Sequence, residues 1–170
     1  MEHIAIHIDR LTNSILEVAT QTTLATYVLP LASTDKKHIK TGWSFDWLGE
    51  LQRPQRKIFK LVITNEPTTI QGLLSLGDGG DHIIVHLVEN AYFNIGKSKK
   101  YEGVGGNLFA FACKHSFERD YDGFVSFLAK SNLVLHYEKA LGAHRIGAST
   151  RMIIETEAAS MLVRQYFSPQ

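Results

Sequence analysis

The sequence predicts an α+β domain, in which strands build one sheet and helices pack against it. The first indication is residues 82–89, HIIVHLVE, which are rich in β-branched residues and apolar on both faces in the middle. This pattern is typical of a central strand that is covered on both sides. The second is residues 99–117, where a glycine-rich turn runs into apolar residues at helical spacing. The third is a pair of strand-like runs, 57–63 and 69–76, whose short polar link suits a hairpin.

The N-terminal part of the chain is less regular. Residues 3–8, HIAIHI, alternate so that three isoleucines share one face, as in a half-buried strand. Residues 11–19 are compatible with a helix and residues 22–29 with a strand. Residues 33–35, Ser-Thr-Asp, could cap a short helix.

The C-terminal part alternates between strands and helices. The helix that follows the glycine turn should end near residues 120–123, and Ser131 or Asn132 is expected to cap the next one, which stops at Gly142. The remaining elements are a strand, a last hairpin and a terminal helix, over residues 124–129, 144–147 with 151–156, and 157–167.

Composition limits the class of protein. The 170 residues are expected to form one domain, 1–170, because 44% hydrophobic and 21% charged residues are ordinary for a globular chain. A net charge of +1 gives no reason to expect nucleic acid or a membrane surface as the partner. No apolar run reaches the roughly 18 residues of a membrane span. The charged N-terminus is unlike a signal peptide, so we expect a cytoplasmic protein.

The glycine turn suggests a seat for phosphate. Gly103, Gly105 and Gly106 would let a ligand approach the backbone, and the first helix amides point outward with the positive end of the helix dipole. A tight turn before a core helix is the alternative. The Walker pattern is excluded because Asn107 and Leu108 follow Gly106, and Leu108 also breaks the dinucleotide fingerprint.

Two motifs carry a family resemblance. Residues 100–105, KYEGVG, resemble the acyl-CoA loop of the GNAT superfamily of N-acetyltransferases, with Lys100 where that family has Arg or Gln. Residues 136–143, HYEKALGA, look like the family's Tyr-Glu-Lys segment with one insertion. The resemblance covers about residues 58–156. It implies a three-layer α/β/α fold whose mixed, mostly antiparallel sheet has six or seven strands, with helices on both faces and two central strands that splay apart around acetyl-CoA.

The resemblance also implies roles for individual residues. Tyr137 would protonate the departing thiolate and Glu89 would be the general base. For Glu89, an ordinary strand-end carboxylate in solvent or paired with Lys97 is the alternative, and His86 is the alternative base. The residues expected to bind acetyl-CoA are Leu87, Val88, Lys100, Tyr101, Gly103, Val104, Gly105, Gly106, Asn107 and Asn132. Asn132 is displaced by two positions, because Lys130 stands where the family has its asparagine.

Other chemistry-bearing residues have simpler interpretations. His82 and His86 would lie roughly 13 Å apart on a strand, too far to share an ion, so no metal site is expected. Cys113, the single cysteine, is expected to be a buried inert thiol, with a nucleophile as the alternative. The aromatic cluster of residues 43–47 either packs in the core or forms a wall of an acceptor pocket.

The sequence thus predicts an acetyl-CoA-dependent N-acetyltransferase, with a primary amine of a small molecule or protein as acceptor, acting as a monomer or homodimer. A catalytically silent acyl-CoA-binding module is the alternative. A toxin that acylates charged transfer RNA is a third reading, and the near-neutral charge argues against it. The identity of the acceptor does not follow from the sequence, because loops rather than the fold choose it.

Overall fold

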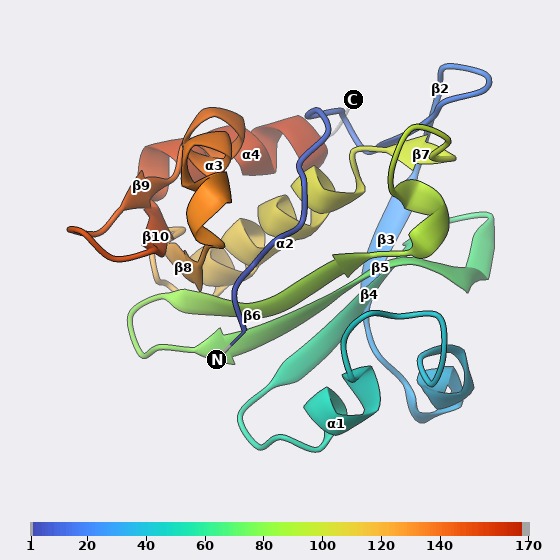
Figure 1. Ribbon diagram of the computed structural model, residues 1–170, viewed down its shortest axis with the longest axis horizontal. Coiled ribbons are helices and arrows are strands. Elements are labelled where there is room, and N and C mark those ends of the chain that lie inside the picture. The colour runs from blue at the N-terminus through green and yellow to red at the C-terminus, as the bar shows by residue number, and fades with distance from the viewer. Residues whose placement is uncertain (1, 168–170) are drawn as a thin grey trace.

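The structure is a computed structural model that describes residues 2–167 (Figure 1). Its centre is a seven-stranded sheet with strand order β3-β4-β5-β6-β8-β10-β9. Neighbouring strands are antiparallel except β6 and β8, which run parallel. The strands are β3 (Thr26–Pro30), β4 (Lys57–Ile63), β5 (Glu66–Asp78), β6 (Ile83–Asn90), β8 (Val125–Leu128), β9 (His144–Arg145) and β10 (Arg151–Ile154).

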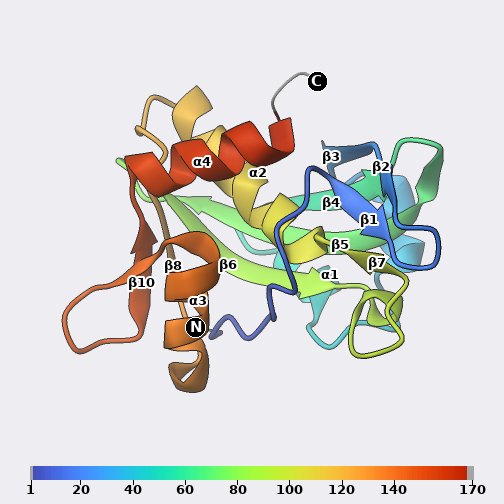
Figure 2. The ribbon, with the colours of Figure 1, turned by 90° about the horizontal axis from the view of Figure 1, so that it is seen from above.

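Helices cover both faces of this sheet, as the sequence predicts. In both ribbon views α1 lies on one side and α2 with α4 on the other (Figures 1 and 2). Each side has its own core: Trp47 of α1 packs with Leu73 and Leu87, and Phe109 of α2 packs with Val88. The helices are α1 (Trp47–Leu51), α2 (Val104–Glu118), α3 (Val134–Leu141) and α4 (Thr156–Phe167), with 3₁₀ turns η1 (Ser33–His38), η2 (Tyr92–Asn94) and η3 (Ser131–Leu133).

The strand β6 is central, as its apolar sequence predicts. It pairs with β5 along most of its length. Leu87 contributes to the core under α1, and Val88 contributes to the core under α2. Burial on both faces explains why this run contains apolar residues at consecutive positions.

The predicted glycine boundaries of the helices are confirmed. Gly103 is the N-cap of α2, with φ of 89°, and Gly142 ends α3 with φ of 69°. Both lie in the left-handed region that glycine adopts without a Cβ clash. The predicted cap of α3 is wrong, because Ser131 and Asn132 belong to η3 and Leu133 is the N-cap, without a side-chain bond.

The N-terminal part differs most from the sequence interpretation. Residues 11–19 contain no helix but the short strand β1 (Ile15–Glu17), which pairs with β2 (Thr22–Leu24) and β7 (Tyr101–Glu102) in a separate small sheet. The β-branched and threonine-rich composition of this region favours strands over helix. Residues 3–8 are extended, yet they form only an isolated bridge, between Ile4 and Ala129.

Within residues 2–167, no helix is long and apolar enough to cross a lipid bilayer.

Candidate active site

The parallel pairing of β6 with β8 is short. Only Ile83 and Ile84 of β6 pair with β8. A β-bulge follows on β6 and leaves His86 as the extra residue between the paired residues Val85 and Leu87. A bulge bends its strand and increases the twist. Beyond this bulge β6 and β8 run on without pairing, so the two central strands splay apart as the sequence analysis expects.

Residues 3–12, which we call the N-terminal strap, occupy the space that this splay opens. The amide of Ile4 donates to the carbonyl of Leu128 over 2.6 Å, and the amide of Lys130 donates to the carbonyl of Ile4 over 2.9 Å. The dark blue chain begins beside α3 in Figure 2, and in both ribbon views it crosses the N-terminal part of α2 (Figures 1 and 2). The strap therefore extends the β8 side of the splay by one parallel bridge, between Ile4 and Ala129.

The helix α3 holds the middle of the strap through two side chains. The phenol of Tyr137 donates to the carbonyl of Ile6 over 2.5 Å, and Nε2 of His136 accepts from the amide of Ile8 over 2.9 Å. Tyr137 is fully buried, and burial raises the pKa of its phenol. Burial, followed by the charge of the stacked His7, lowers the pKa of His136. Both side chains therefore face the strap in their neutral forms.

The glycine turn holds a carboxylate. The amide of Gly103 donates to Oδ1 of Asp9 over 3.1 Å, and Nζ of Lys99 lies 3.2 Å from Oδ2 of the same side chain. Asp9 thus lies before the first turn of α2, where the helix dipole favours negative charge. The predicted phosphate seat is therefore occupied by an anionic group of the chain itself.

The strap also packs on the first turn of α2. A Cβ built on Gly105 would lie 3.0 Å from Cδ1 of Ile8, and one built on Gly106 would lie 2.9 Å from Cδ2 of Leu11. Both distances are shorter than ordinary contacts between carbon atoms. The two glycines are therefore needed here for the close approach of another segment.

Glu89 is held by three donors. Its Oε1 accepts from the amide of Phe45 over 3.1 Å and from Nε1 of Trp47 over 2.9 Å, and its Oε2 accepts from the amide of Ser44 over 2.7 Å. A carboxylate has about four acceptor positions, so most of them are used. The side chain is buried and joins the end of β6 to the segment before α1. The aromatic residues of this segment thus combine core packing, by Trp47, with a place in the wall of a cavity, by Phe45.

The free edge of β6 also bears on binding. The amide of Ala91 donates to the carbonyl of Gln71 on β5. Because hydrogen-bonded pairs alternate along an antiparallel ladder, Glu89 also points its amide toward β5, while Val88 and Asn90 point theirs toward the splay. These two amides are available to an extended ligand that runs beside β6.

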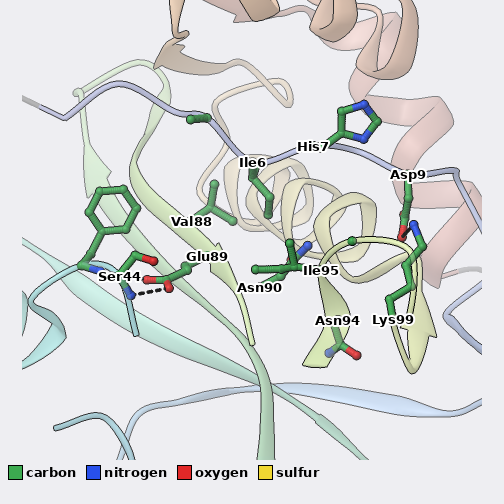
Figure 3. Close-up of a pocket in the computed structure, with 13 residues that line it drawn as sticks. Ile6, His7, Asp9, Ser44, Val88, Glu89, Asn90, Asn94, Ile95 and Lys99 are labelled. Atoms are coloured by element: carbon green, nitrogen blue, oxygen red, sulfur yellow. Dashed lines mark hydrogen bonds and ion pairs between the residues drawn. The ribbon is translucent and has the colours of Figure 1, made fainter. Parts of the chain in front are cut away.

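A cavity of about 580 Å³ lies between the strap and the end of β6 (Figure 3). The strap contributes one wall, with Ile6 and His7. The other walls come from the end of β6, from the segment before α1 and from the loop that leads to the glycine turn. The close-up shows Glu89 turned to Ser44. The lining residues are Ala5, Ile6, His7, Asp9, Ser44, Phe45, Val88, Glu89, Asn90, Asn94, Ile95, Gly96 and Lys99.

Two buried amides give this cavity polar groups. Oδ1 of Asn90 is buried and has no hydrogen-bond partner among the described residues. The side chain of Asn94 is fully used, because Nδ2 donates to Gln71 and Oδ1 accepts from the amide of Tyr101. Asn94 therefore fixes the loop before the glycine turn, whereas Oδ1 of Asn90 is an acceptor left without a partner.

The other predicted donor-site residues are placed as follows. Val104 and Asn107 are buried in α2, and Nδ2 of Asn107 donates to Oγ1 of Thr26. Lys100 is exposed beside the ring of Tyr101, so Lys99 and not Lys100 pairs with the carboxylate at the turn. Residues that do not line the cavity include Leu87, whose side chain packs under α1, and Asn132, which is exposed on η3.

The structure contains no metal-binding arrangement of three His, Cys, Asp or Glu side chains within residues 2–167. Cys113 is buried in α2, and burial raises the pKa of its thiol. An uncharged buried thiol is a poor nucleophile, which agrees with the inert role expected for it.

The sequence pattern did not predict the contacts that the strap makes at the glycine turn. Asp9 was given no role in the site, although it follows directly on the alternating run of residues 3–8. The local signal was present: a carboxylate after a strand-like segment with exposed alternate residues. Its partners, Gly103 and Lys99, lie some 90 residues further along the chain, which no local pattern reports.

Comparisons with known proteins were made for sequence and for structure. No protein-family model matches the sequence, and no curated protein matches it. The structure, in contrast, is similar to solved structures that include KacTA in complex with DNA, with a TM-score of 0.60 and 13% identity over 81% of this chain and 98% of that chain.

Two further solved structures are similar to this one. The first is described as bound with acetyl-CoA and the second as an acetyltransferase. AtaTR bound with acetyl-CoA has a TM-score of 0.57 and 12% identity, over 81% of this chain and 97% of that chain. Spermidine N-acetyltransferase SpeG from Vibrio cholerae has a TM-score of 0.52 and 13% identity, over 79% of this chain and 95% of that chain. At these identities the likeness shows the fold.

Proposed function

We infer that this chain, which has the fold of the GNAT N-acetyltransferases, is an acetyl-CoA-dependent N-acetyltransferase that acts on a primary amine. The observation that supports this most is the anion seat at the glycine turn. The amide of Gly103 and the ammonium of Lys99 already hold a carboxylate at the N-terminus of α2. The same groups suit a phosphate oxygen of the donor.

The pantetheine arm of acetyl-CoA, in its extended form, would run beside the free edge of β6. The ladder alternation directs the amides of Val88 and Asn90 to this edge. An amide in this position stabilises negative charge on a thioester carbonyl oxygen during attack. We assign this role to the amide of Val88, as the sequence analysis expects, and we assign Oδ1 of Asn90 to an N–H group of the donor arm or of the acceptor.

The reaction itself needs few protein groups. Acetyl-CoA supplies the acyl thioester, whose C–S bond breaks as the acceptor nitrogen forms its new C–N bond. Tyr137 is the proposed acid that gives its phenolic proton to the departing sulfur; its raised pKa keeps that proton available at neutral pH. Glu89 is the proposed base, and Oε2, which accepts only one hydrogen bond, is the oxygen with acceptor capacity left for the amine proton.

The acceptor class rests on analogy. Similar structures include an acetyltransferase of spermidine and the ribosomal-protein-S18-alanine N-acetyltransferase from Escherichia coli, the latter with a TM-score of 0.51. Both names describe amine acceptors. With the strap in place, the cavity beside the end of β6 measures about 580 Å³, which is room for a small amine or the end of a peptide. A silent acyl-CoA-binding module is the less favoured alternative.

The test is release of free thiol from acetyl-CoA in the presence of a panel of polyamines, amino sugars and peptides. We expect turnover with at least one amine, and loss of acetyl-CoA binding in Gly105→Asp, which places a carboxylate at the seat. Tight binding of CoA without turnover across the panel would favour the silent module. Wild-type affinity in Gly105→Asp would remove the glycine turn from the donor site.

A further inference from the structure

The N-terminal strap makes the contacts that a bound ligand would make in this fold. Its backbone at Ile4 forms a bridge with the chain beyond β8, its carbonyl at Ile6 accepts a hydrogen bond from the phenol of Tyr137, and its carboxylate at Asp9 accepts a hydrogen bond from the amide of Gly103. These are three different kinds of contact, to a strand edge, to the proposed acid and to the anion seat. All three are made by residues of one extended segment, Ile4, Ile6 and Asp9.

The strap and an acyl-CoA molecule cannot occupy these positions together. The side chains of Ile8 and Leu11 lie so close to Gly105 and Gly106 that even a Cβ would press against them. A diphosphate at the first turn of α2 needs far more room than a methyl group. The phenol of Tyr137 likewise cannot donate to a thioester sulfur while it donates to Ile6. The two states are therefore mutually exclusive.

The contacts that hold the strap can be broken and replaced by contacts to a ligand. His3, Ala5, His7 and Arg10 are exposed, and the principal apolar anchors of this stretch are Ile4 and Ile8. The ion pair of Arg10 with Glu102 lies near the surface, where ion pairs contribute little, whereas the ion pair of Asp9 with Lys99 is partly buried. Residues that follow the strap are fixed independently, because β1 pairs with β7.

We propose that the N-terminal strap is an internal competitive ligand of the acyl-CoA site, in which the carboxylate of Asp9 takes the place of a donor phosphate. Binding of the donor requires the strap to leave, with a pivot between Thr12 and β1. This inference rests on the proposed function, since it assigns an occupant to the same site. It predicts that the strap sets the donor affinity and keeps Tyr137 engaged until a donor arrives.

The first experiment uses the full chain and follows amide hydrogen exchange with and without saturating CoA. The amides of Ile4 and Ile8 are hydrogen-bonded only through the closed strap. We expect them to lose protection when CoA binds, while amides in the middle of α2 stay protected. If CoA binds and the strap amides keep their protection, the proposal is overturned and the proposed function stands.

The second experiment removes the strap's anion. Asp9→Asn should raise the affinity for CoA by about tenfold, because the closed strap loses a charge-assisted hydrogen bond and its ion pair with Lys99. Asp81→Asn is the matched control, since its carboxylate is exposed and pairs with His82 outside the site. Circular dichroism of both variants shows that the fold is kept.

Pantetheine, which carries no phosphate, separates release of the strap from simple removal of a negative charge. If the strap competes, Asp9→Asn raises the affinity for pantetheine as well as for CoA. A gain for CoA with no gain for pantetheine indicates only a local charge effect and overturns the proposal. If neither wild type nor Asp9→Asn binds CoA, the proposed function fails and the strap has no ligand to compete with.

Discussion

Tyr137→Phe is expected to change donor binding and turnover in opposite directions. The substitution removes one oxygen and keeps the ring, which is fully buried and packs edge-on against Phe127 with ring centroids 5.4 Å apart. The bond that disappears is the donation from the phenol to the carbonyl of Ile6. The closed strap therefore loses a contact, while the proposed acid loses its proton.

The magnitudes follow from these two losses. A hydrogen bond of this kind contributes about 0.5–1.5 kcal/mol net. If the closed strap is weakened by that amount, the affinity for CoA rises roughly two- to tenfold, since 1.4 kcal/mol corresponds to a factor of about ten. Loss of a general acid typically lowers turnover about 10²–10⁴-fold, and we expect the low end because a thiolate is a tolerable leaving group.

The assays are calorimetry with CoA and steady-state release of thiol from acetyl-CoA at saturating donor. Tyr166→Phe is the matched control, because the phenol oxygen of Tyr166 accepts from the strap amide of Thr12 over 3.0 Å. It should raise the affinity for CoA and keep its turnover. An unchanged turnover in Tyr137→Phe, with chemistry shown to be rate-limiting, would refute its role as acid; a weakened affinity for CoA would refute the competition with the strap.

Three further substitutions test the fold around the site. Glu89→Gln places an amide nitrogen where a carboxylate oxygen accepts, so we expect about 1.5–3 kcal/mol lower stability in urea unfolding together with reduced turnover at neutral pH; unchanged stability would contradict the three hydrogen bonds. Gly72→Ala would bring its Cβ to 2.9 Å from Leu108, so thermal unfolding should show a loss of roughly 1–3 kcal/mol, and wild-type stability would mean that α2 can shift. Burial, then the charge of Arg56, lowers the pKa of His86 to about 4. Because the unfolded chain binds this proton at its ordinary value near 6.5, the free energy of unfolding should fall as the pH drops from about 6.5 to 4, and His86→Gln should lessen that fall while His82→Gln should not.

Several elements could be predicted from the sequence because their signals are local. The strand β4 occupies the predicted residues 57–63, and α2 begins directly after Gly103 as the glycine turn indicates. In β6 a run of apolar residues specified a strand buried on both faces. In such segments the hydrophobic period and the turn residues specify the strand or helix whichever distant segment packs against it. The local sequence is therefore enough to predict the element.

The surroundings of the site residues depend on contacts between distant parts of the chain. The type of residue and its place on a strand end suggested Glu89 as a base, but its three donors come from residues 44–47, more than forty positions away. Likewise Tyr137 was placed on a helix beside the splayed strands, but the acceptor of its proton is Ile6, 131 positions before it. The roles of both residues stay predictions that the substitutions above test.

The N-terminal strap shows what the sequence by itself determined and what it could not determine. The alternation of residues 3–8 determined that this segment is extended and buries one face, and Ile4 and Ile8 are indeed buried. Which strand edge it meets is a different question, because an extended segment can pair with any edge that leaves amides and carbonyls unpaired. The bulge at His86 and the splay of β6 from β8 create such an edge. Only the tertiary structure therefore decided that this segment lies in the splay beside the glycine turn, with Asp9 at the amide of Gly103 that we propose for a donor phosphate.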